Sequence, residues 1–95
     1  MDPKELHVMQ ALEKAGATEH LSDREKHLIG LAVTTTRGCS YCTGGRTKKA
    51  LAAGISQESL TAATDLVAAV NAGVAVRTVL LGIEEQACDG PECTS

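Results

Sequence analysis

The sequence is poor in aromatic residues. It has no Trp and no Phe, and Tyr41 is its one aromatic residue in 95. Burial must therefore come from Ala, Val and Leu, whose small side chains let helices approach closely but each remove little apolar surface from water. A chain of this length buries only about 60–65% of its unfolded surface. We therefore expect a single domain that gains stability by covering a second surface in an oligomer.

Basic charge is also scarce. Nine Lys and Arg residues stand against twelve Asp and Glu, a net charge of -3, which argues against a nucleic-acid-binding domain with its basic patch. The N-terminal segment has no apolar stretch after a basic start, so no signal peptide is expected. The longest nearly apolar run, Ala72 to Ile83, is interrupted by Arg77 and is shorter than the ~20 residues of a membrane span. These features predict a soluble cytoplasmic protein with no membrane partner.

Helical periodicity runs through the whole chain. No stretch alternates apolar and polar residues as a half-buried strand does. The pattern predicts a compact all-α domain without β-sheet over residues 1–86, followed by a flexible cysteine-containing tail over residues 87–95. Asp2 as N-cap and Pro3 at the first helical position mark the expected start of the first helix. Gly16 marks its end.

The second and the last helix are predicted from their caps and apolar residues. Residues 22–25, Ser-Asp-Arg-Glu, fit a capping box, and the apolar residues of 28–33 cover most of that helix, which is therefore expected to be buried. Ser56 caps a helical region over 57–86 with two apolar stripes. One stripe can face the core, and the other requires a partner subunit. A straight helix of this length would measure ~45 Å, so a bend near 71–73 is expected.

The third helix is expected to start at Cys39 or Ser40 and to run to Ala53, with Gly54 closing it. Gly44 and Gly45 lie inside this helix, where each costs roughly 1 kcal/mol relative to Ala. This cost indicates either close backbone packing at these positions or access to a site.

Four cysteines carry the chemistry of the sequence. Cys39 and Cys42 form a C-x-x-C at a helix N-terminus, where free N–H groups and the helix dipole stabilise a thiolate. The motif fits a redox pair, half of a zinc site or two inert structural cysteines. Cys88 and Cys93 fit a second, resolving pair, or they complete a zinc site of four thiolates with Cys39 and Cys42. The third alternative is that Cys88 and Cys93 belong to a C-terminal tail without a function.

Three segments around the C-x-x-C resemble one family. They are Leu28–Val33, with the sequence LIGLAV; Gly38–Cys42, with GCSYC; and Ala50–Ser56, with ALAAGIS. Together they are similar to the AhpD-like branch of the carboxymuconolactone decarboxylase family, over roughly Leu21 to Leu81. The resemblance implies an all-α fold and homo-oligomers that are commonly trimers or hexamers. No cofactor is expected.

The resemblance also implies thiol-dependent peroxidase or disulfide reductase activity, with a thiol or disulfide electron donor that the sequence does not identify. Cys42 would be the attacking thiol and Cys39 the resolving thiol. The lactone-decarboxylating branch generally lacks this cysteine pair, so a ring-opened lactone is not the expected substrate.

Two positions depart from the family pattern. The family histidine four residues after the second cysteine is Arg46 here, and the family glutamate twelve residues before the first is His27. The family's proton relay, which runs from the glutamate through the histidine to the thiol, is therefore absent from this sequence. Arg46, one turn after Cys42, would lower the thiol pKa but cannot accept a proton, whereas His27 can. The alternative is that both are solvated surface residues.

The sequence therefore predicts a thiol–disulfide oxidoreductase or weak peroxidase. Its candidate catalytic residues are Cys42, Cys39, Arg46 and His27. The alternative is a non-catalytic oligomeric module whose cysteines bind a metal or sense redox state.

Overall fold

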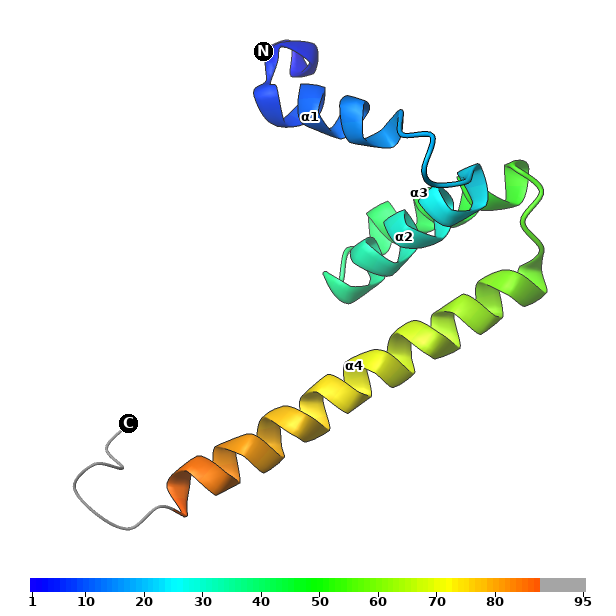
Figure 1. The fold of residues 1–95 in the computed structure, drawn as a ribbon. Coiled ribbons are helices and arrows are strands. Elements are labelled where there is room, and N and C mark those ends of the chain that lie inside the picture. Colours follow the sequence, from blue (N-terminus) through cyan, green and yellow to red (C-terminus); the bar gives the residue numbers. More distant parts are fainter. Residues whose placement is uncertain (88–95) are drawn as a thin grey trace.

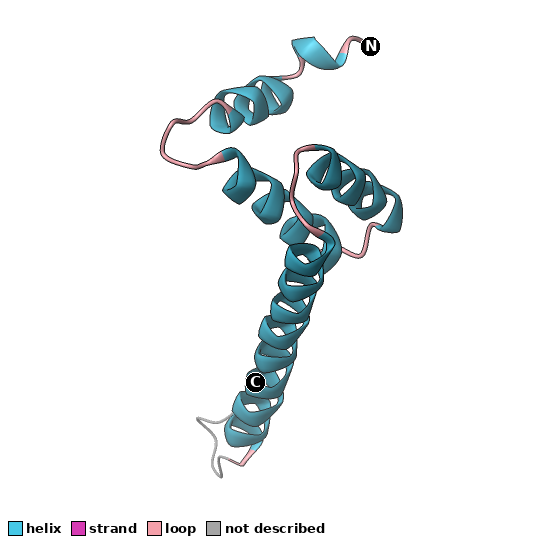
Figure 2. Cartoon of the chain, turned by 90° about the vertical axis from the view of Figure 1, so that its right-hand side faces the viewer, coloured by secondary structure: helices cyan, strands magenta, loops and turns pink. Residues whose placement is uncertain are grey.

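Residues 1–87 are described by the computed structural model, and they form four α-helices after one short 3-10 turn (Figure 1). The elements are the turn Pro3–Glu5, α1 (His7–Gly16), α2 (Asp23–Thr36), α3 (Ser40–Ala52) and α4 (Gln57–Gln86). This part of the chain contains no strand (Figure 2), which confirms the predicted all-α class. The predicted roles of Cys88 and Cys93 lie outside the described residues.

Serine side chains set the starts of α2 and α4. The Ser22 hydroxyl accepts the Glu25 N–H at 3.1 Å, and the Glu25 carboxylate accepts the Ser22 N–H at 2.8 Å, which confirms the capping box. Ser56 caps α4 in the same way. Near the N-terminus the prediction is wrong, because Asp2 and Pro3 open only the 3-10 turn and α1 begins at His7.

The core is small and lies where α2, α3 and α4 meet. Its buried members are Leu31, Ala50, Ile55 and Leu60, with Leu28 packed against them. Ile55 reaches the core because Gly54, at φ 91°, ends α3 in the left-handed region. The Ile55 N–H then donates to the Ala50 carbonyl, as in a Schellman motif. A glycine stop thus delivers an apolar side chain to the core.

α2 is less buried than its sequence predicts. Leu31 is 5% exposed, but Ile29 and Val33 are 50% and 56% exposed. Both line an open cavity between α1 and α2. α2 therefore contributes one buried side chain, Leu31. The prediction of a buried helix is wrong because α1 does not close over this face.

α4 makes the molecule elongated. The helix runs from Gln57 to Gln86 without the bend expected near 71–73, and it projects well past α2 and α3 (Figure 1). The radius of gyration is 19.0 Å, against about 12 Å for a compact domain of this length. The predicted compactness is therefore wrong, because the helical backbone continues through Gly73 and only the first part of α4 packs on the core.

From Leu66 onward, α4 leaves large apolar side chains exposed. They are Leu66, Val70, Val74, Val76, Val79, Leu80, Leu81 and Ile83. The accessible surface of the chain is 7825 Å², against about 5,200 Å² for a folded monomer of this mass. By length and composition alone α4 could also cross a membrane, a criterion that core helices of soluble proteins meet as well. Contiguous apolar surfaces of this kind are uncommon on monomeric soluble proteins.

Candidate redox site

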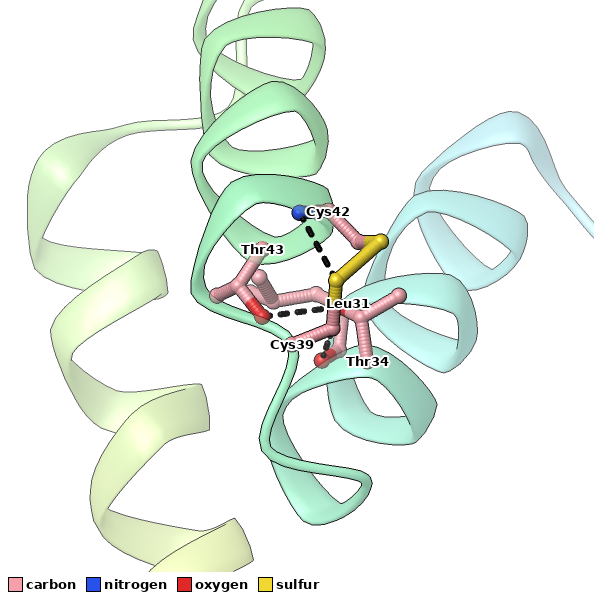
Figure 3. Close-up of a disulfide and its surroundings, with 5 residues drawn as sticks. All are labelled: Leu31, Thr34, Cys39, Cys42 and Thr43. Atoms are coloured by element: carbon pink, nitrogen blue, oxygen red, sulfur yellow. Dashed lines mark hydrogen bonds between the residues drawn. A yellow bond between two sulfur atoms is a disulfide. The ribbon is translucent and has the colours of Figure 1, made fainter.

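The two cysteines of the C-x-x-C form a disulfide at the N-terminus of α3 (Figure 3). Cys39 is the N-cap residue, and its Sγ accepts the Cys42 N–H at 3.2 Å. The two Cα atoms are 5.3 Å apart, within the usual range for a disulfide. The predicted start of the helix at Cys39 or Ser40 is confirmed.

The turn that presents Cys39 depends on Gly38, whose φ is 75°. The Cys39 N–H donates to the Thr34 carbonyl at 3.1 Å, and the Gly38 N–H donates to the Thr35 carbonyl at 3.0 Å. This is a Schellman motif. Because a residue with a Cβ pays roughly 1–2 kcal/mol in this region, glycine holds Cys39 between the end of α2 and the start of α3.

The two sulfur-bearing residues differ in access to solvent. Cys42 is exposed, whereas Cys39 is half-buried. Tyr41, between them, is 92% exposed and takes no part in the core. A reaction partner in solution therefore meets Cys42 before it meets Cys39.

Two threonines tie the start of α3 to α2 beside the disulfide (Figure 3). The Thr43 hydroxyl donates to the Thr34 hydroxyl at 3.1 Å, and the Thr34 hydroxyl donates to the Leu31 carbonyl at 3.2 Å. Sequence reasoning missed this pair. The signal that could have found it is a threonine on each side of the predicted turn.

Arg46 lies across α2 at Gly30. A Cβ built on Gly30 would lie 2.5 Å from Arg46 Nη1 and 2.8 Å from Cζ, so the missing side chain makes room for the guanidinium. Arg46 is one turn after Cys42 on α3, as predicted from the spacing, but its guanidinium is directed at α2. Gly30 is a second residue that sequence reasoning missed.

His27 lies on α2 and is half-buried. Thr34, whose hydroxyl meets α3 beside the disulfide, follows seven residues later, which is roughly 10 Å along the helix axis. Over residues 1–87 neither His27 nor Arg46 is hydrogen-bonded to a sulfur; the Cys39 Sγ accepts the Cys42 N–H instead. The structure thus brings Cys39 and Cys42 together, turns Arg46 toward Gly30 and places His27 nearer the start of α2.

The described residues hold no group of three or more His, Cys, Asp or Glu side chains able to share a metal ion. Cys39 and Cys42 are bonded to each other. The remaining ligands of the zinc alternative, Cys88 and Cys93, lie outside the described residues.

Over residues 1–87, four helices without a sheet, with a disulfide at a helix N-terminus, define an all-helical fold. The family model for the carboxymuconolactone decarboxylase family matches residues 3–85. The chain therefore belongs to this family, and the resemblance found around the cysteines is confirmed. No curated protein and no solved structure matches the chain significantly.

Proposed function

We propose that the protein is a thiol–disulfide oxidoreductase that cycles Cys39 and Cys42 between dithiol and disulfide. The observation that carries the proposal is the disulfide at the N-terminus of α3, with Cys42 exposed to solvent. Helix N-termini lower the pKa of a thiol because their free N–H groups and dipole favour the thiolate. The thiolate is the form that exchanges with disulfides.

The two cysteines have different parts in the proposed cycle. The Cys42 thiolate attacks a substrate disulfide, forms a mixed disulfide and releases one substrate thiolate. The Cys39 thiolate then attacks the Cys42 Sγ, closes the internal disulfide and releases the second thiolate. The substrate gains two electrons, and an external dithiol returns them by reducing the Cys39–Cys42 bond. The Cys42 N–H at the Cys39 Sγ favours the thiolate of the resolving residue.

Disulfides fit this site better than peroxides do. Exchange with a disulfide expels a thiolate, whose conjugate acid has a pKa near 8.5. Cleavage of a peroxide expels a far more basic oxygen, which needs a proton donor in place. Arg46 and His27 occupy the relay positions of the family, and Arg46 holds its proton permanently. We therefore propose disulfide exchange as the main activity, with slow peroxide reduction through the same thiols.

The decisive experiment follows the reduced protein with hydroxyethyl disulfide by mass spectrometry, in a background with Cys88 and Cys93 replaced by Ser. The parent protein should end as the internal disulfide, with two equivalents of 2-mercaptoethanol released. Cys39→Ser should stop at a mixed disulfide on Cys42. Cys42→Ser should react at least about tenfold more slowly. Equal rates for Cys42→Ser and the parent would reject the proposal.

The alternative of a metal-binding module is tested on the same protein. Purification under reducing conditions followed by metal analysis should give a metal-free chain with two reactive thiols at Cys39 and Cys42. Stoichiometric zinc that is lost on chelation, together with loss of thiol reactivity in the metal-bound form, would favour the metal-binding alternative.

We also propose that the protein is a homo-oligomer, with a trimer or hexamer as the expected form. The support is the apolar surface of α4 beyond Leu66, which one subunit leaves uncovered. Many small side chains along this helix allow a second helix to approach closely. Arg77 lies within this stretch and would be costly at the centre of a bilayer, so a second copy is the better partner for α4.

A further inference from the structure

We propose that the cavity between α1 and α2 binds a small apolar molecule that carries a carboxylate. The inference goes beyond the redox function and does not depend on it. The cavity measures about 370 Å³, within the range of small-molecule sites. It is lined by Leu12, Ala15, Gly16, Leu21, Lys26, Ile29, Gly30, Val33, Thr34 and Arg46.

The walls of the cavity are apolar and open to water. Leu12 from α1 is 56% exposed, Ile29 and Val33 from α2 are 50% and 56% exposed, and Leu21 from the connecting segment is 37% exposed. Covering these side chains with a hydrocarbon group would stabilise the complex because it removes apolar surface from water. The walls therefore favour a ligand with an aliphatic body.

The polar groups of the cavity select the charge of the ligand. Lys26 and Arg46 are half-buried cations, and no acidic side chain is among the described residues that line the cavity. The missing side chain at Gly30 lets the Arg46 guanidinium lie against α2 at this wall. A guanidinium binds a carboxylate through two parallel hydrogen bonds, so an anionic head group complements the site.

A second copy of the chain could cover the same apolar wall. That second copy would give Lys26 and Arg46 an anionic partner only if it also placed a carboxylate between them. A small anionic ligand both covers the apolar wall and supplies the carboxylate. Ligand binding and oligomer mass distinguish these two occupants.

The test is calorimetric titration of the oxidised full-length protein with octanoate and with octanol as the neutral probe. Octanoate should bind saturably and at least about tenfold more tightly than octanol, the difference expected for one charge-assisted contact. Arg46→Met and Lys26→Met should each weaken octanoate binding by about tenfold, whereas Arg37→Met, outside the cavity, should leave it unchanged. Equal binding of the two probes, or no saturable binding, would overturn the proposal.

The comparison of octanoate with octanol needs no substitution, so it decides the question even if Arg46→Met fails to fold. Circular dichroism of each variant shows whether it has folded.

Leu12→Asp tests the alternative that a second copy of the chain covers the wall. A lower oligomer mass in Leu12→Asp, combined with no octanoate binding to the parent protein, would make this wall a subunit interface and reject the ligand site. Failure here leaves the mass-spectrometric test of the cysteine pair unaffected.

Discussion

Cys39 serves two purposes at one atom. Its Sγ is half of the disulfide, and it also accepts the Cys42 N–H as the N-cap of α3. The first four N–H groups of a helix have no acceptor within the helix, so the cap acceptor contributes to stability in its own right. Capping and redox chemistry at this residue can be separated by substitution.

In the reduced protein we predict that Cys39→Ser keeps the stability of the parent chain, since a serine hydroxyl caps a helix well. Cys39→Ala should lower the free energy of unfolding by about 1 kcal/mol, because the Cys42 N–H loses its acceptor. Urea unfolding of both variants with reductant present gives the comparison. Equal stabilities for the two variants would show that the Sγ is not a significant cap.

Arg46 lies one helical turn after Cys42, a spacing across which its charge can act on the thiol. We predict that Arg46→Ala raises the pH midpoint of Cys42 alkylation and that Arg46→Lys preserves most of the parent value. The change should be below about one pH unit because Cys42 is exposed and solvent screens the charge. His27→Ala should slow turnover more than it moves this midpoint. If the midpoint of Cys42 alkylation is unchanged in Arg46→Ala, the charge of Arg46 does not act on Cys42, and the role of Arg46 is limited to its contact with α2 at Gly30.

Among the helical elements, the joint between α2 and α3 depends on the conformation of Gly38. We predict that Gly38→Ala lowers the free energy of unfolding by about 1–2 kcal/mol, because φ at this position is in the left-handed region. Gly44→Ala is the matched control. Gly44 lies inside α3, where a Cβ meets nothing within 4 Å, so alanine should stabilise by about 0.5–1 kcal/mol. Thermal unfolding of the oxidised variants should show shifts of opposite sign.

The capping box at the start of α2 makes the free energy of unfolding depend on pH. The backbone N–H of Ser22, and then its side chain, hold the pKa of Glu25 below its ordinary value of 4.5. A lowered folded-state pKa stabilises the protein above pH 4.5, and this stabilisation is lost as the pH falls through the folded-state value. Glu25→Gln keeps the capping box but not the charge. Its stability should therefore fall less than that of the parent protein between pH 7 and about pH 3.5 in urea unfolding.

For the whole molecule, we predict a solution mass that is a multiple of the 9.8 kDa chain. Val74→Asp, on the exposed part of α4 where Val74 is 60% exposed, should lower that mass by placing a charge on the apolar surface. Gln57→Asp adds the same charge at the polar start of α4 and should leave the mass unchanged. Light scattering measures both. A parent protein that is monomeric at micromolar concentration, or that is recovered only in detergent, would contradict the assembly.

Sequence alone determined the features that depend on neighbours a few residues apart. The capping box of Ser22 and Glu25, the glycine stop at Gly54, and the position of the C-x-x-C at a helix start were all predicted correctly. Each is a local arrangement, closed by hydrogen bonds within about six residues. The same locality explains why the helical class was evident before any contact between helices was known.

Only the tertiary structure decided which residues meet across helices and how far α4 extends. The contact of Arg46 with Gly30 and the hydrogen bond from Thr43 to Thr34 join neighbouring helices, and side-chain spacing along one helix says nothing of such pairs. The bend expected in α4 assumed that one chain must bury its own apolar residues. α4 stays straight instead. A bend in its middle would break backbone hydrogen bonds, whereas a straight helix keeps all of them and leaves only apolar side chains exposed.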